Sequence, residues 1–184
     1  ATAYGDGQLN SSQSSTFSQT DVFNTRTSWN LGVQNLGKDN RSLTFAGNFT
    51  YRNKAGNSSD YSITDFGESS DIKNLMYGTA VNYLATEGIL SYVEPISSNW
   101  SLQTRFTACY ISQSDDISAF NGIDGSANDN YSSYSRNQDL LLRERLLMQY
   151  EKDNAKAVLG LQIDQENVKI LSRYLGVENV TGKG

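Results

Sequence analysis

Two segments of the chain alternate between apolar and polar positions with a period of two. In the segment RSLTFAGNFTYR, residues 41–52, every second residue from Leu43 to Tyr51 is apolar or glycine. The segment WSLQTRFTACYIS, residues 100–112, alternates in the same way from Trp100 onward. A side-chain period of two predicts extended β-strands with one apolar and one polar face. What covers the apolar face, a protein core or lipid, then decides the class of protein.

The same pattern predicts about six long strands, at 18–33, 41–52, 73–94, 100–114, 137–150 and 155–168. Short turns are predicted near 35–40, 95–99 and 151–154, where glycine, asparagine, aspartate and proline gather. Long polar loops are predicted near 53–70 and 115–136 and at both ends of the chain. Connections that alternate between short and long predict an antiparallel up-and-down meander. We therefore expect residues 1–184 to form one all-β unit, a single segment of a partial β-barrel.

Two of these strands depart from a simple alternation. In 73–94, Tyr77 and Tyr83 share one phase, and Leu90 and Tyr92 come into that phase only if a β-bulge inserts one residue at 86–88. The segment 137–150, NQDLLLRERLLMQY, contains strong helix formers, so both a strand and a helix are open. We favour a strand there, because the apolar residues would surround a helix without forming one stripe.

Composition removes several classes of function. The chain has a net charge of -5, no histidine and one cysteine. Without clustered lysine and arginine we expect no nucleic-acid partner, and without histidine the commonest general base and metal ligand are missing. The single proline in 184 residues agrees with long paired strands, because proline cannot donate to a ladder.

No constellation of residues predicts catalysis, a metal site or a cofactor, and we expect the protein not to be an enzyme. The segment DGSANDN, residues 124–130, carries carboxylates in a predicted loop. Its spacing does not fit the twelve-residue calcium loop, and no glutamate closes the site. We interpret it as a solvated loop.

Strand length and aromatic placement favour a membrane barrel over a soluble sandwich. Sandwich strands usually have about 5–6 residues, and the alternating segments here are longer. Interface aromatics are expected beside the short turns, at Tyr92, Trp100 and Tyr150. The alternative is a soluble or surface-attached β-sandwich, an adhesin-like binding module that exposes its loops rich in serine, asparagine and tyrosine.

The segment YVEPISSNWSL, residues 92–102, resembles the outer-membrane β-barrel domain of Bacteroidetes TonB-dependent receptor-like proteins. In that family a strand ending in a Tyr-x-Glu-Pro segment turns tightly into a strand of alternating apolar residues. A polar loop then leads to another hairpin. The similar order of turn, strand and loop extends over about 41–173.

The resemblance implies a segment of an outer-membrane transporter in bacteria that takes up a large nutrient ligand. It implies outer-membrane lipid, the rest of the barrel, a plug domain, TonB and a surface lipoprotein as partners. Because the smallest common membrane barrel takes about eight strands, we expect this chain to be a fragment, a proteolytic product or a partial barrel.

The alternation assigns side chains to the two surfaces of such a wall. The apolar positions expected to face lipid are Leu43, Phe45, Phe49, Leu102, Phe106, Leu159 and Leu161. The polar positions expected to face the lumen are Asn48, Arg52, Gln103, Arg105, Arg143, Arg145, Gln162 and Asp164. Glu144 is the exception, because its position places a carboxylate among the lipid-facing residues.

Overall fold

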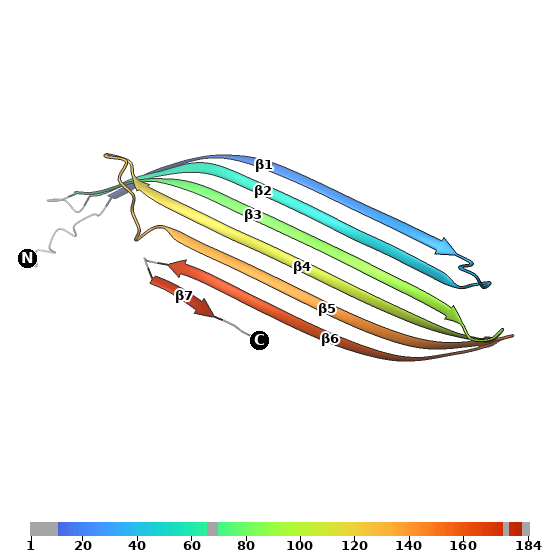
Figure 1. Cartoon of the computed structure of the whole chain (residues 1–184). Helices are drawn as coiled ribbons and strands as arrows, with labels where there is room; N and C mark the ends of the chain where they lie inside the picture. The colour runs from blue at the N-terminus through green and yellow to red at the C-terminus, as the bar shows by residue number, and fades with distance from the viewer. Residues whose placement is uncertain (1–10, 66–69, 175–176, 182–184) are drawn as a thin grey trace, which may run out of the picture.

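The computed structural model describes residues 11–65, 70–174 and 177–181, and these form one antiparallel sheet (Figure 1). The seven strands pair in chain order, which confirms the predicted all-β up-and-down meander. Six strands are long and the seventh is short. Their bounds are β1 Ser11–Gln34, β2 Ser42–Asp65, β3 Ser70–Pro95, β4 Trp100–Asn121, β5 Ser133–Lys152, β6 Ala155–Tyr174 and β7 Val177–Thr181.

The three short turns lie at one end of the sheet, which we call the turn end (Figure 1). They occupy residues 35–41, 96–99 and 153–154, close to the predicted positions. Asn35, Gly37, Asn40 and Asp153 have positive φ angles there, a conformation that glycine, asparagine and aspartate adopt more readily than other residues. The tight reversals therefore follow directly from the local sequence. We call the opposite end the loop end.

The strands extend much further toward the loop end than their polarity predicts. Residues 53–65 continue β2, and 115–121 and 133–136 belong to β4 and β5, so the predicted long loops there are mostly strand. Residues 66–69 lie outside the described residues, as do 1–10, 175–176 and 182–184 of the predicted end loops. The rest of the predicted C-terminal loop is strand, because 169–174 continue β6 and 177–181 form β7. Likewise, β1 begins at Ser11 rather than at residue 18. Polar residues on both faces of a strand indicate water on both faces, and we misinterpreted that pattern as loop.

The register of β3 is unbroken, so the predicted β-bulge at 86–88 is wrong. Pairing of β2 with β3 and of β3 with β4 continues through Gly88 without an inserted residue. Tyr77 and Tyr83 therefore lie on one face of the sheet, and Leu90 and Tyr92 on the other. The apparent change of phase arises because β3 carries apolar residues on both faces. The segment 137–150 is strand, as favoured.

The described residues form a single layer with almost no core. Leu75, at 3% exposed, and Ala119, at 1%, are the buried hydrophobic residues in this part of the chain. The side chains of Phe45 and Asn48 on β2 point to opposite sides of the sheet, because one has an odd and the other an even position along the strand. We name the two surfaces the Phe45 face and the Asn48 face. On the Phe45 face, large apolar side chains stay exposed; Leu31 is 66% exposed and Leu159 is 76% exposed.

Candidate functional site

An apolar band covers the part of the Phe45 face next to the turn end. The pairing registers place all seven predicted lipid-facing residues on this face. Toward the loop end the band ends at Asn53, Asn82 and Ser114, which share one hydrogen-bonded row. Beyond this row the face is mixed, with the exposed Phe17, Ile72 and Met76 among polar residues. The band comprises Phe23, Trp29, Leu31, Val33, Leu43, Phe45, Phe49, Tyr51, Leu84, Leu90, Tyr92, Trp100, Leu102, Phe106, Tyr110, Leu140, Leu142, Leu146, Met148, Tyr150, Leu159, Leu161 and Ile163.

Aromatic residues border the band on both sides. At the turn end, the rings of Trp100 and Tyr150 pack with centroids 4.9 Å apart. At the side toward the loop end, the rings of Phe23 and Tyr51 lie 6.2 Å apart, and Tyr110 accepts a hydrogen bond of 2.8 Å from the side chain of Gln138. Sequence analysis found only the first border, because the second becomes visible when the strands are set in register.

The spacing of the two borders fits a membrane. Trp100 and Tyr110 stand ten residues apart on β4, which is about 33 Å along a strand. With the strand tilt of about 40° that is usual in membrane barrels, this length spans roughly 25 Å, the height of their outward apolar band.

The band also runs obliquely across the strands. On β1 its limit toward the loop end is Phe23, which lies opposite Asn53. On β6 the limit is Ile163, which shares a row with Phe45 through β3, β4 and β5. Asn53 and Phe45 are eight residues apart on β2, which is about 26 Å along the strand. The five strand spacings from β1 to β6 measure about 24 Å across the sheet, so this limit is inclined to the hydrogen-bonded rows by roughly 45°.

The limit at the turn end moves in the same direction. Leu43 of β2 shares a row with Thr104, which is four residues beyond Trp100 on β4. On β6 the band ends at Leu159, which shares a row with Leu102, two residues nearer the turn end than Thr104. From β2 to β6 this limit moves about 7 Å over about 19 Å of sheet width, an inclination of roughly 20°. Both limits therefore cross the strands obliquely in the same direction, and the limit toward the loop end is inclined by nearly the angle expected of a tilted barrel wall.

Glu144 interrupts the band near its middle. Its row contains Leu31, Phe45, Leu90, Phe106 and Ile163, which are all apolar. The strand around Glu144 is regular, with Phe106 and Ile163 directly opposite. Glu144 therefore lies on the Phe45 face among apolar residues, as the alternation predicts. A lone carboxylate on a lipid-facing surface is unfavourable, although less so than a lysine or arginine.

The Asn48 face carries all eight residues predicted to face a lumen. Arg143 donates two hydrogen bonds to Asp164, of 2.9 and 3.1 Å. Arg145 donates one of 3.1 Å to Gln162, and the amide of Gln162 donates one of 3.0 Å to Asp164. These four side chains of β5 and β6 form one network.

Two other contacts on the Asn48 face involve residues that sequence analysis did not single out. Asn48 donates a hydrogen bond of 2.8 Å to Glu87, a neighbour on β3. The guanidinium of Arg52 lies 5.6 Å from the ring centroid of Tyr83. Glu87 and Tyr83 were missed because partners on adjacent strands emerge only from the register.

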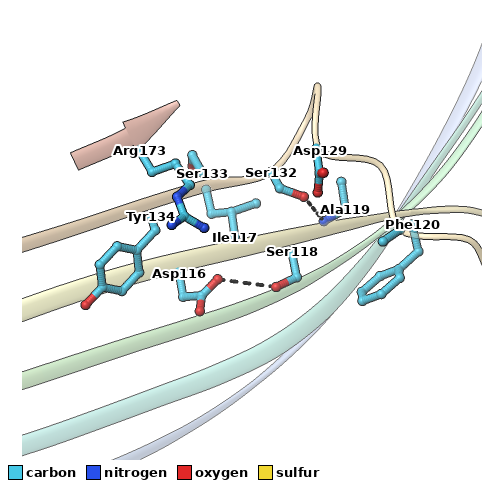
Figure 2. Close-up of a pocket in the computed structure, with 11 residues that line it drawn as sticks. Asp116, Ile117, Ser118, Ala119, Phe120, Asp129, Ser132, Ser133, Tyr134 and Arg173 are labelled. Carbon is cyan, nitrogen blue, oxygen red and sulfur yellow. Dashed lines mark hydrogen bonds between the residues drawn. The ribbon is translucent and has the colours of Figure 1, made fainter. Parts of the chain in front are cut away.

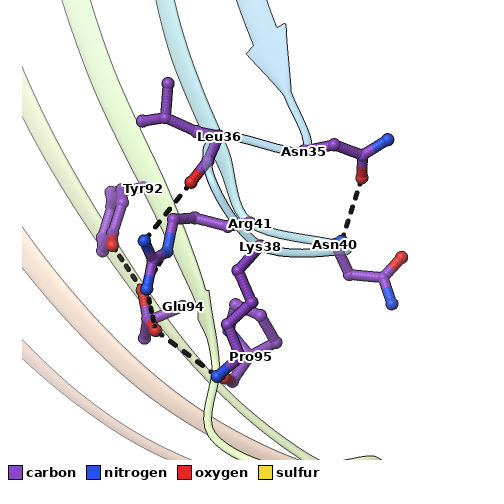
Figure 3. A network of polar contacts seen from close by, with 8 residues as sticks. All are labelled: Asn35, Leu36, Lys38, Asn40, Arg41, Tyr92, Glu94 and Pro95. Carbon is purple, nitrogen blue, oxygen red and sulfur yellow. Dashed lines mark hydrogen bonds and ion pairs between the residues drawn. The ribbon is translucent and has the colours of Figure 1, made fainter.

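A network of charged side chains joins two turn-end segments that are distant in sequence (Figure 3). Arg41 binds both carboxylate oxygens of Glu94, each at 2.8 Å. Lys38 lies 3.7 Å from Glu94 and also donates to the backbone oxygen of Pro95, and the hydroxyl of Tyr92 donates to Glu94. The hydrogen bonds from Arg41 and Tyr92 lower the pKa of Glu94 to about 2.

At the loop end, residues 122–132 fold against β4 and border a hollow of about 470 Å³ (Figure 2). The hydroxyl of Ser132 accepts a hydrogen bond of 2.9 Å from the backbone of Ala119. Ser126 donates to Asp124 through its backbone and its hydroxyl, and these bonds lower the pKa of Asp124. The carboxylate of Asp124 is thus held in local turn structure, and in the described residues no group of His, Cys, Asp or Glu is arranged to hold a metal ion.

No helix in the part of the chain that the structure describes is long and apolar enough to cross a membrane. Comparison with models of known protein families finds no match, and comparison with curated protein sequences finds none either.

Proposed function

We propose that this chain forms part of the wall of a bacterial outer-membrane β-barrel, in a TonB-dependent receptor-like transporter that takes up a large nutrient ligand. The observation that carries the membrane part of the proposal is the oblique apolar band. A soluble core requires only that apolar residues meet other apolar residues. A band whose limit toward the loop end is inclined by roughly 45° to the hydrogen-bonded rows is expected when tilted strands cross a slab of lipid.

The energetics support lipid as the cover of the band. Each large apolar side chain moved out of water gains about 1.5–3 kcal/mol, and sixteen of the 23 residues of the band stay exposed in the single layer. The described residues supply no second layer that could cover Leu43, Phe45, Phe49, Leu102 and Phe106. The two-sheet sandwich of the alternative interpretation is therefore not formed by this part of the chain.

Further strands are needed to complete such a wall. β1 has a neighbour on one side only, and β6 pairs with β7 only from Ile170 to Tyr174. Unpaired strand edges do not occur in the hydrocarbon region, because their N–H and C=O groups would lack partners. We therefore include the rest of the barrel among the partners. A plug domain, TonB and a surface lipoprotein belong to the proposal through the resemblance of 92–102.

Spin-label accessibility in lipid vesicles tests the proposal. Single cysteines would replace Leu31, Phe45, Phe106 and Leu161 on the Phe45 face, and Asn30, Thr44, Arg105 and Gln162 on the Asn48 face, after Cys109 is changed to serine. We expect oxygen, which concentrates in lipid, to relax labels on the first set, and a water-soluble nickel complex to relax those on the second. The depth should follow the oblique line from β1 to β6.

Two results would contradict the membrane assignment. One is equal access of the nickel complex to both sets of labels. The other is a folded monomer that stays in the aqueous phase without detergent. Uptake of ligand by intact cells, with and without an energised inner membrane, tests the transport part separately.

A further inference from the structure

Arg105 of β4 and Arg145 of β5 stand directly opposite each other on the Asn48 face. In such a pair the Cβ atoms lie about 4.5–5.5 Å apart, and like charges in this position destabilise a sheet. Both side chains are exposed. The register brings the two cations together from segments 40 residues apart, so their proximity is a property of the fold.

The neighbouring carboxylate is already occupied. Asp164 accepts two hydrogen bonds from Arg143 and one from Gln162. Arg105 has no hydrogen bond or ion pair with another described residue. Arg145 donates its one hydrogen bond within the described residues to the amide oxygen of Gln162, and its charge also acts on Asp164. The row of the pair is completed by Thr44, Ser91 and Gln162. These side chains are polar and uncharged, so the row supplies no carboxylate to the two arginines.

We propose that Arg105 and Arg145 form a binding site for a carboxylate group. A guanidinium presents paired N–H donors in a plane that matches the two oxygens of a carboxylate. Through its bond to Arg145, Gln162 holds one of the two forks in place. The backbone N–H groups at these positions belong to the sheet ladder, so the donors come from the side chains alone.

This inference does not depend on lipid covering the opposite face. It follows from the pairing of β4 with β5 and from the charges on the Asn48 face. If the membrane proposal holds as well, the site lies inside the barrel at the level of Phe106 and Glu144, which flank the two arginines in sequence on the other face.

Titration of the full-length protein with succinate at constant ionic strength tests the site, with heat of binding and the thermal unfolding midpoint as readouts. We expect Arg105→Gln and Arg145→Gln to weaken succinate binding by about tenfold or more, the worth of one charge-assisted hydrogen-bonded group. Arg105→Lys should weaken it nearly as much, because a point charge lacks the fork. Without succinate and at low salt, Arg105→Gln should raise the midpoint, because it removes the repulsion between like charges.

Arg26→Gln is the matched control. Arg26 is an exposed arginine on the same face, opposite Thr50, so it has the same charge but no opposing arginine. We expect it to change succinate binding by less than about twofold. Equal weakening by Arg26→Gln would show general electrostatic attraction and overturn the proposal. So would unchanged binding in the Arg105 and Arg145 variants.

Discussion

Arg41 and Glu94 form a two-pronged ion pair between the first short turn and the end of β3, with both nitrogen–oxygen distances at 2.8 Å. Residues 53 positions apart are thereby joined at the turn end. The Tyr-x-Glu-Pro segment that carries the family resemblance contains Glu94. The structure gives that glutamate a physical role, because it anchors the neighbouring turn through Arg41 and Lys38.

The ion pair of Glu94 should make the stability of the folded state depend on pH in the acidic range. Its pKa falls from an ordinary value of 4.5 to about 2 in the folded chain, chiefly through the hydrogen bond from Arg41. A lowered carboxyl pKa stabilises the fold fully above pH 4.5, and this contribution disappears as the pH falls toward 2. We expect Glu94→Gln to lower the unfolding midpoint at pH 7 and to approach the unaltered protein near pH 2.

Glu151→Gln provides the comparison for that measurement. Glu151 is an acid beside another short turn, and it lies 3.5 Å from Lys156 in a more exposed ion pair. Because exposed pairs contribute little, the midpoint of this variant should follow that of the unaltered protein at every pH. A Glu94→Gln midpoint that runs parallel to the unaltered protein from pH 7 to 2 would show that the ion pair does not set the acid response.

Gly47 makes room for the indole of Trp29. A Cβ atom at residue 47 would lie 2.2 Å from a ring carbon of Trp29, whose ring packs on Phe45 at a centroid distance of 4.4 Å. Gly47→Ala must therefore displace the indole, and overpacking of this kind costs about 1–3 kcal/mol. The fluorescence of Trp29, measured with Trp100 changed to phenylalanine, should shift, and the free energy of unfolding should fall.

Gly88→Ala tests whether that effect is specific. Gly88 lies directly opposite Gly47 on the same face, and a Cβ atom there would meet nothing within 4 Å. We expect no shift of the Trp29 emission and no loss of stability in this variant. If both alanines shift the emission alike, the indole does not occupy the position above Gly47.

The alternation of side chains predicted the faces and turns well, because a strand presents successive residues to opposite sides wherever it lies. Strand length was harder to predict. Residues 53–65 are as polar as a loop, yet they continue β2, since water on both faces selects the same residues as a loop does. Pairings such as Asn48 with Glu87 and Arg105 with Arg145 depend on the register, which no single segment encodes. The oblique course of the band also depends on the register between strands, so it could not be predicted from any one segment.

Glu144 offers a test of what surrounds the band. If lipid covers it, Glu144→Leu removes a carboxylate from an apolar row, and the free energy of unfolding in phospholipid vesicles should rise by about 1–2 kcal/mol. Glu166→Leu, on the exposed opposite face of the neighbouring strand, should give no such gain. A loss of stability in Glu144→Leu would instead reveal a polar or cationic partner for this carboxylate.

An arginine placed within the band should be far more disruptive than one placed beyond it. Phe106 lies between the two aromatic borders on β4, and Ser114 lies on the same face of the same strand, beyond the border marked by Tyr110. Near the middle of a bilayer an outward arginine costs about 2–4 kcal/mol, and near the interface roughly 0–1 kcal/mol. We expect Phe106→Arg and Ser114→Arg to show this difference in urea unfolding from vesicles.

The comparison separates lipid from a protein cover, because Ser114→Arg adds the same side chain to the same strand. Loss of the phenyl ring contributes to the effect of Phe106→Arg, and Phe106→Ala measures that part. If lipid covers the band, the excess cost of arginine over alanine should shrink in vesicles of shorter acyl chains, which bring the interface closer to residue 106. An excess that is independent of chain length would mean that protein, not lipid, lies against Phe106.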